Sequence, residues 1–178
     1  MLSAIFTGLF LQLAALTLTA LVGLGWVAPA FGDHVSGHML LALVSALLTL
    51  FVQTVVLFYS MAAGRRVKDL SEAGKWATGN ETEHREMLKT VVTIRKKIWP
   101  FAITSIVLVI LTFWLGAATH THATSDSRLH LGFAIATLLT SLIAIVLEMK
   151  WLPKNEAMMD LAWVKYGEYE NPLKEETF

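Results

Sequence analysis

Four uninterrupted apolar segments constrain this chain more than any other feature of its sequence. They cover residues 4–27, 38–63, 98–118 and 129–147. The hydrocarbon layer of a membrane is about 30 Å thick and a helix rises about 1.5 Å per residue, so each segment can span a bilayer as a helix. The composition agrees, because 55% of the residues are hydrophobic and only 16% are charged, which is unusual for a soluble domain. We predict an all-α integral membrane protein with four transmembrane helices in a single membrane domain, residues 1–178.

The distribution of basic residues predicts how the chain is oriented. Nine of the 14 Lys and Arg residues lie between the second and third spans, four follow the fourth span, and only Arg128 lies elsewhere. Basic residues concentrate on the cytoplasmic side of membrane proteins. We therefore expect both termini to be cytoplasmic, most simply in a bacterial inner membrane. The connections 28–37 and 119–128 then face outward.

The long basic connection, residues 64–97, has the pattern of a helical hairpin. Helix-forming residues continue to Trp76, a Thr-Gly-Asn turn follows, and Asn80 with Glu83 matches the N-terminal capping box of a second helix. We predict that the second and third helices extend into the cytoplasm as this hairpin. The C-terminal tail, residues 153–178, is expected to begin as an amphipathic helix.

A basic cluster lies where this connection meets the third span. Arg95, Lys96 and Lys97 stand beside Trp99. Lys, Arg and Trp are common at membrane–water interfaces, where they contact lipid headgroups. The lipid bilayer is therefore the first predicted partner, and the cluster is interpreted mainly as an anchor.

An internal repeat is the most informative pattern in the chain. At an offset of 92 residues the second and fourth spans match at three polar positions: His38 with His130, Ser45 with Thr137, and Thr49 with Ser141. Trp26 and Trp114 also occupy similar places near the outer ends of the first and third spans, at an offset of 88. The pattern favours two helical hairpins related by a pseudo-twofold axis along the membrane normal.

The matched residues also share one face of each helix. At about 100° per residue the polar side chains fall within a narrow arc on both spans. Lipid cannot satisfy polar groups, so the two stripes should face each other or another subunit. The stripe members are His34, His38, Ser45, Thr49, Gln53 and Ser60 on the second span, and Asp126, His130, Thr137, Ser141 and Glu148 on the fourth.

The outer side concentrates potential metal ligands. Imidazole binds haem iron, copper and zinc, and the spacing of His34 and His38 sets two rings on one helical face. Asp126 and His130 repeat that spacing with a carboxylate. The candidate metal ligands are His34, His38, His120, His122, His130 and Asp126.

Two cofactor arrangements fit these ligands. In the first, His38 and His130 are the two axial ligands of a b-type haem, held between two helices. In the second, three or four of the candidate ligands bind copper, iron or zinc. The symmetry of the histidine pair favours haem, whereas the number of nearby ligands favours a non-haem ion. The layout resembles the general plan of four-helix membrane b-type cytochromes, without a family motif.

Several functional classes lack support in the sequence. The chain has no cysteine, so thiolate metal sites and iron–sulfur clusters are excluded. Common catalytic motifs are missing, no catalytic residue is predicted, and acidic residues balance the basic connection, which argues against nucleic-acid binding. The leading hypothesis is a haem electron-transfer protein or subunit of a respiratory assembly, with other membrane subunits or a second copy as partners. The alternatives are a non-catalytic accessory subunit and a non-haem copper, iron or zinc protein.

Overall fold

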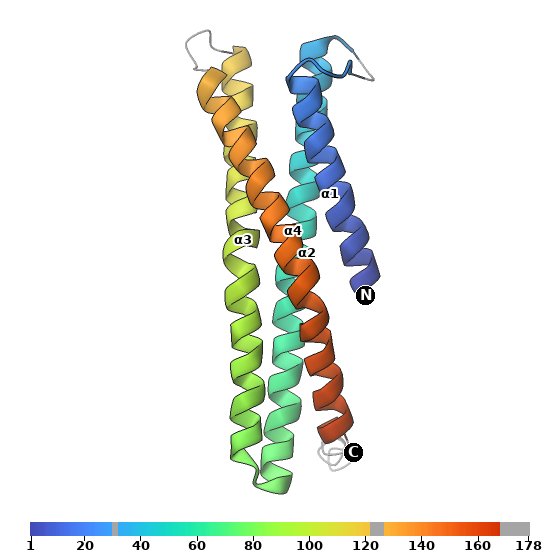
Figure 1. Ribbon diagram of the computed structural model, residues 1–178, viewed down its shortest axis with the longest axis vertical. Coiled ribbons are helices and arrows are strands. Elements are labelled where there is room, and N and C mark those ends of the chain that lie inside the picture. The colour runs from blue at the N-terminus through green and yellow to red at the C-terminus, as the bar shows by residue number, and fades with distance from the viewer. Residues whose placement is uncertain (30–31, 122–126, 168–178) are drawn as a thin grey trace, which may run out of the picture. The chain divides into compact units, whose positions relative to one another are not determined.

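The computed structural model consists of four long helices (Figure 1). They are α1 (Leu2–Gly23), α2 (His34–Thr78), α3 (Glu81–Thr121) and α4 (Ser127–Tyr166). The structure describes residues 1–29, 32–121 and 127–167, without the side chains of residues 76, 77, 120 and 121, and contains no strand within those ranges. All four helices are long and apolar enough to cross a membrane. The predicted all-α class with four candidate membrane spans is confirmed.

Three of the helices are longer than a bilayer requires. α1 has 22 residues, whereas α2, α3 and α4 have 45, 41 and 40. About 20 residues are enough to cross the hydrocarbon layer. The chain divides into two compact units, Met1–Val56 with Pro100–Val146, and Leu57–Trp99 with Leu147–Phe178. Each of the three longer helices contributes to both units.

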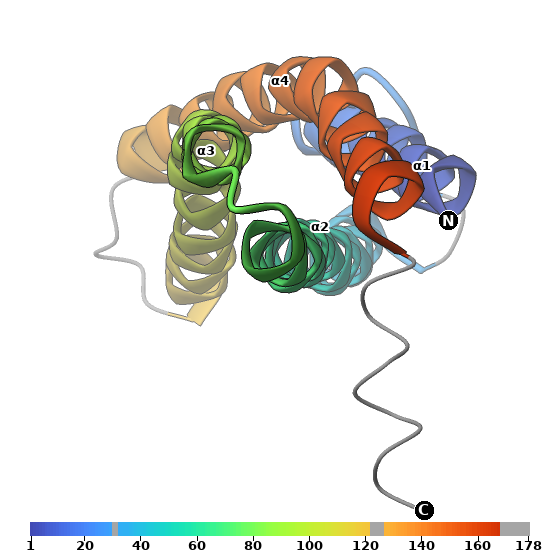
Figure 2. The same cartoon turned by 90° about the horizontal axis from the view of Figure 1, so that it is seen from below.

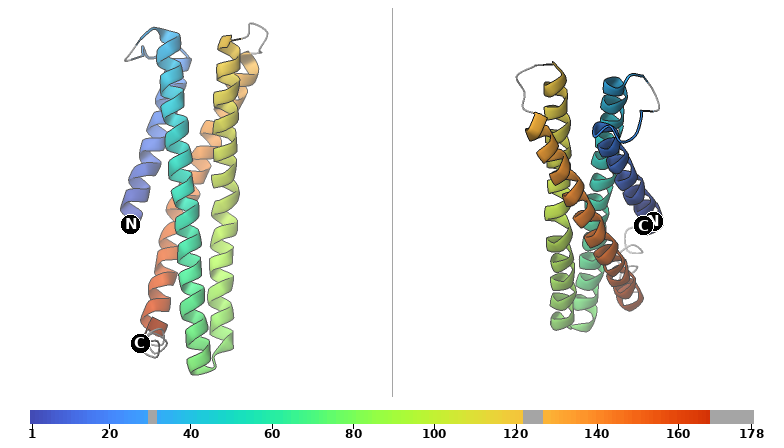
Figure 3. Two further views of the ribbon diagram at one scale, coloured as in Figure 1. Left: turned by 180° about the vertical axis from the view of Figure 1, so that it is seen from behind. Right: turned by 45° about the horizontal axis from the view of Figure 1, so that its top comes forward.

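The first unit is a bundle of four helical segments. α1 lies beside the first part of α2, and the last part of α3 lies beside the first part of α4 (Figure 3). The middle parts of the predicted polar stripes face the inside of this bundle, whereas His34 at the start of α2 is exposed. The stripe residues Ser45, Thr49, Gln53, Thr137 and Ser141 are each at most 2% exposed. Apolar side chains such as Leu47, Phe51 and Leu139 are exposed instead, as expected for a surface that faces lipid.

The end of α1 shows why this helix is shorter than its apolar segment. Leu24 is the C-cap, and the N–H of Trp26 donates to the carbonyl of Leu21 over 3.0 Å. Gly25 follows with a φ of 74°, a left-handed conformation that glycine adopts at little cost. The helix therefore ends at Gly23, four residues before the apolar segment does.

The second unit packs three helical segments around an apolar cluster. Val67 and Leu70 of α2, Met87 and Val91 of α3, and Ala162 and Tyr166 of α4 form this cluster. Gly74 of α2 lies directly against the ring of Tyr166, and any side chain at this position would collide with the ring. The end of α4, shown in Figure 2, therefore packs against both α2 and α3. α4 also continues through Pro153, so the first part of the C-terminal tail is one helix with the fourth span.

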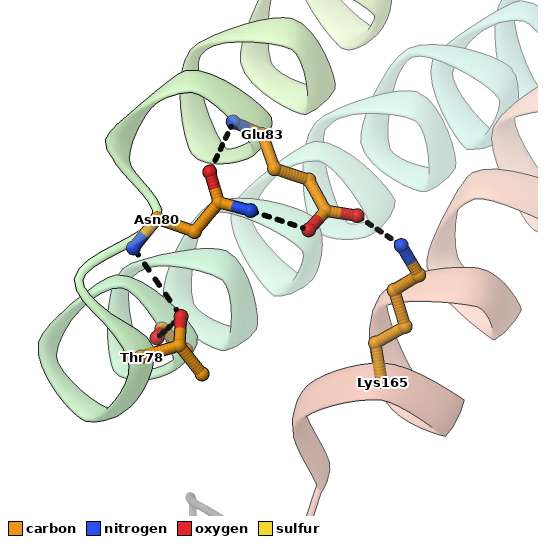
Figure 4. Close-up of polar contacts among 5 residues, drawn as sticks. Thr78, Asn80, Glu83 and Lys165 are labelled. Carbon is orange, nitrogen blue, oxygen red and sulfur yellow. Dashed lines mark hydrogen bonds and ion pairs between the residues drawn. The ribbon is translucent and has the colours of Figure 1, made fainter.

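A short turn joins α2 to α3, as the sequence predicts. Gly79 directly follows α2 and has a φ of 70°, and Asn80 is the N-cap residue that precedes α3. The Asn80 Oδ1 accepts a hydrogen bond of 3.2 Å from the N–H of Glu83, and the Asn80 Nδ2 donates to the Glu83 carboxylate over 3.2 Å (Figure 4). The same carboxylate pairs with Lys165 of α4, which holds the pKa of Glu83 below its usual value. The predicted N-cap at Asn80 is confirmed, but the reciprocal bond of a capping box differs, because the Asn80 N–H donates to the Thr78 hydroxyl and Glu83 accepts from the Asn80 side chain instead. The cytoplasmic location of the hairpin stays a prediction.

Removing the Asn80 cap should loosen the start of α3. Replacing an N-cap residue by Ala costs about 1 kcal/mol, so Asn80→Ala should speed hydrogen exchange of the first-turn amides roughly fivefold. Asn80→Ser is the matched control, because a serine hydroxyl can still accept the Glu83 N–H. Exchange measured by mass spectrometry in detergent should separate the two variants. Equal protection in both would show that the cap does not stabilise this turn.

Candidate functional site

Two histidines from different helices meet in one pocket of the first unit. His38 lies in the second turn of α2 and His130 in the first turn of α4. Their ring centres are 6.4 Å apart, and the two ring planes make an angle of 77°. Both side chains are half-buried. The sequence alignment of the second and fourth spans therefore identifies two residues that do approach each other.

The separation of the rings matches that of two ligands on one metal ion. A metal–imidazole bond is about 2 Å long, and the ring centre lies about 1 Å beyond the bonded nitrogen, so imidazoles on opposite sides of one ion have centres about 6 Å apart. The observed distance of 6.4 Å agrees with this value. The spacing of the two rings is therefore compatible with both imidazoles binding one ion.

The hydrogen bond of His130 defines which of its nitrogens can bind a ligand. Its Nδ1 lies 3.2 Å from the carbonyl oxygen of Thr112 on α3. A carbonyl only accepts hydrogen bonds, so Nδ1 carries the proton and Nε2 of the neutral ring keeps its lone pair. Metal-binding histidines typically donate their second N–H in this way, which fixes the tautomer and the ring orientation.

A glycine on the neighbouring helix makes room for each imidazole. A Cβ atom added to Gly23 of α1 would lie 2.7 Å from Cε1 of His38, and one added to Gly116 of α3 would lie 2.8 Å from Cε1 of His130. Real Cβ atoms do not approach other atoms so closely. Each histidine therefore packs edge-on against a helix backbone, and only glycine is compatible with that packing.

Each glycine is accompanied by a threonine one turn away, which bonds to the partner helix. The Thr19 and Ser45 hydroxyls are 2.7 Å apart, and so are the hydroxyls of Thr112 and Thr137. The two contacts join α1 to α2 and α3 to α4. Hydroxyl pairs of this kind stabilise helix packing in membranes by roughly 0.6 kcal/mol, and here they fix the helices beside each histidine.

The pocket around the histidines is largely apolar and bordered by small side chains. It encloses about 700 Å3 of space, counting the part that is open to its surroundings. Ala20, Ala42, Ala117 and Ala134 contribute to its walls, together with larger residues such as Phe113.

The other predicted ligands are not brought to this pocket. His34 is exposed at the start of α2, and the neighbouring Asp33 accepts a hydrogen bond of 2.7 Å from the N–H of Ser36 as the helix cap. That bond lowers the pKa of Asp33. His122, Asp126 and the side chain of His120 lie outside the described residues. Among the side chains that are described, no three His, Asp or Glu residues gather as a metal site.

Sequence reasoning missed the contribution of α1 and α3 to the site. The signal was present as a Thr-x-x-x-Gly pattern, Thr19 to Gly23 and Thr112 to Gly116. These residues are 93 positions apart, close to the 92 that relate His38 to His130. The sequence alignment of the first and third spans instead matched Trp26 with Trp114, at an offset five residues smaller, and this hides the pattern. Both tryptophans are exposed, at 75% and 64%, and do not belong to the site.

Comparisons with protein families, with characterised proteins and with solved structures find no significant match to this chain. Any statement on its function therefore depends on its own residues and their geometry.

The glycines beside the histidines should not tolerate even a methyl group. Gly116→Ala should destabilise the protein by about 1–3 kcal/mol, because the new Cβ forces the ring of His130 and the helix apart. Gly132→Ala is the matched control on α4: no other side chain lies within 4 Å of its added Cβ, and alanine favours the helix by up to about 1 kcal/mol. Thermal melting followed by circular dichroism should show opposite shifts. Similar shifts in both variants would contradict the close packing at Gly116.

Proposed function

We propose that this protein is a membrane electron carrier that holds one b-type haem between His38 and His130. The observation that carries the proposal is the pair of imidazoles, with ring centres 6.4 Å apart, in the lining of a pocket formed by all four helices. Both histidines would serve as axial ligands. Such a haem accepts and returns one electron and keeps no open coordination position for oxygen or a substrate.

Two features of the pocket support haem over a bare ion. The walls are mainly apolar, as suits a large flat macrocycle, and small residues such as Ala42 and Ala134 border the space between the helices. A copper, iron or zinc ion without a macrocycle needs three or four protein ligands, and the described part of the chain offers two at this place.

The duplicated contacts support a pseudo-twofold arrangement of two hairpins, which we propose as the origin of the site. Gly23 packs against His38 in the same way as Gly116 packs against His130. The hydroxyl pair made by Thr19 likewise corresponds to the one made by Thr112. A flat, nearly symmetric macrocycle suits two such halves, because each supplies one axial ligand from the same depth.

The accessory-subunit hypothesis is less well supported. It assigned the polar stripes to packing against partner helices, but Ser45 and Thr137 are bonded within the chain, and Thr49, Gln53 and Ser141 are buried inside the unit. Electron transfer still requires a redox partner, for which we propose another membrane subunit or a second copy of the chain.

The proposed orientation places both termini and the basic hairpin in the cytoplasm of a bacterium, with the histidine pocket near the outer face. The chain contains no cysteine. Variants with a single added cysteine therefore show directly on which side of the membrane that position lies. Ser127→Cys lies at an exposed position before His130, and Thr82→Cys lies at an exposed position on the hairpin. A membrane-impermeant thiol reagent should label only the first in intact cells and both after lysis. The reverse pattern would overturn the orientation.

The haem proposal predicts a sharp reduced-minus-oxidised absorption band in protein purified with a mild detergent, with one haem per chain. His38→Ala and His130→Ala should each remove the low-spin spectrum, because one axial ligand is lost. His34→Ala and His84→Ala are the controls, since His34 is exposed and His84 is bonded to Ser71 in the second unit. Both controls should keep the full spectrum.

Each contrary outcome selects another function. Stoichiometric copper, iron or zinc without a haem band would replace haem by a non-haem centre that uses ligands outside the described residues. A protein free of haem and metal that copurifies with a large complex would favour the accessory subunit. Retention of low-spin haem in both pocket variants would place the cofactor elsewhere.

A further inference from the structure

A groove between α3 and α4 in the second unit has the properties of a binding site. Lys89, Thr93 and Ile94 line it on α3, and Trp151, Lys154 and Met158 line it on α4. It encloses about 820 Å3, counting the part that is open to its surroundings. None of these residues belongs to the histidine pocket, so this groove is independent of the proposed haem site.

The groove combines an apolar floor with a cationic rim. Ile94 is buried and Met158 half-buried, while Lys89 and Lys154 are exposed on opposite sides. The ammonium group of Lys154 lies 4.3 Å from the ring centre of the half-buried Trp151. This cation–π contact keeps a positive charge above the aromatic wall of the groove.

Further lysines continue the rim toward the apolar spans. At about 100° per residue, Lys96 and Lys97 share the face of Thr93 on α3, and Lys150 lies one turn from Lys154 on α4. All three are exposed. The nearest acidic residues on the α3 face, Glu83 and Glu86, lie farther from the span than Lys89. Glu83 is already paired with Lys165, and the residues that line the groove include two lysines and no acidic residue, so the groove itself is positively charged.

The structure separates these lysines from the other members of the basic cluster. Arg95 turns toward α2, where its Nη2 donates to the carbonyl of Met61 over 3.2 Å. Trp99 also turns toward α2, and its Nε1 donates to the Ser60 hydroxyl over 2.8 Å. These two residues therefore serve helix packing, whereas Lys96 and Lys97 are exposed to contact a ligand.

We propose that the groove binds the headgroup of an anionic phospholipid from the adjacent membrane leaflet. The third apolar span begins at Ile98 on α3, after the groove residues of that helix, and the fourth ends at Leu147 on α4, before them. Both walls of the groove are therefore continuous with an apolar span. Basic pockets between helices at this depth bind phosphate headgroups, and Trp is favoured at the same level. The lysines contact the phosphate, and the apolar floor covers the glycerol and the first part of an acyl chain.

The test compares lipid binding by the purified full-length chain in bilayers of two compositions. Phosphatidylcholine nanodiscs, with or without added phosphatidylglycerol, provide neutral and anionic bilayers, and native mass spectrometry measures the retained lipid. Phosphatidylglycerol should be retained selectively and should raise the melting temperature. The double variant Lys89→Ala/Lys154→Ala should bind it roughly thirtyfold more weakly, because each lysine near a membrane surface contributes about 1 kcal/mol, which is a factor of roughly five.

A matched control separates the groove from general surface charge. Arg65→Ala/Lys68→Ala removes two exposed basic residues from α2 in the same unit and should leave lipid retention unchanged. Lys89→Arg/Lys154→Arg keeps the charge and should also bind. Equal losses in the groove and control variants, no preference for the anionic lipid, or full displacement by millimolar inorganic phosphate would overturn the proposal. Circular dichroism on each variant verifies the helical fold.

Discussion

A bilayer offers no hydrogen bonds to a polar side chain, and this constraint accounts for the interior of the first unit. Polar residues on the second and fourth spans turn away from lipid, and hydroxyls on α1 and α3 pair with two of them. The helices are thereby fixed in rotation about their own axes. Once that rotation is fixed, His38 and His130 must also turn inward and meet. The candidate site is a consequence of the same rule that orders the bundle.

Much of this arrangement was predictable because its signals are periodic. Long apolar runs give the number of spans, and the recurrence of Ser45, Thr49, Thr137 and Ser141 gives the buried face of two helices. The turn at Gly79 and Asn80 was also predictable, because its chemistry is local: a glycine in a left-handed conformation followed by a capping side chain.

Other features could not be predicted because they depend on contacts between distant parts of the chain. The role of Gly23 becomes visible only when α1 lies beside His38, and a glycine in an apolar helix is otherwise unremarkable in sequence. The packing of Gly74 against Tyr166, 92 residues later, is of the same kind. Pro153 shows the reverse case, in which a strong local signal has no structural effect. In the sequence it marks the start of the C-terminal tail, yet α4 continues through it. Likewise, the adjacent residues Arg95 and Lys96 differ in role because only one of them faces α2.

The close packing of Gly23 on His38 and of Gly116 on His130 has an evolutionary consequence. A glycine that would collide with an imidazole if it gained a single carbon is not free to drift while the histidine remains. If the histidine is replaced by a small residue, the restriction on its glycine disappears. Among homologous chains, each glycine and its histidine should therefore be inherited or lost as a pair, and the two pairs should be lost together wherever the centre they enclose has been abandoned.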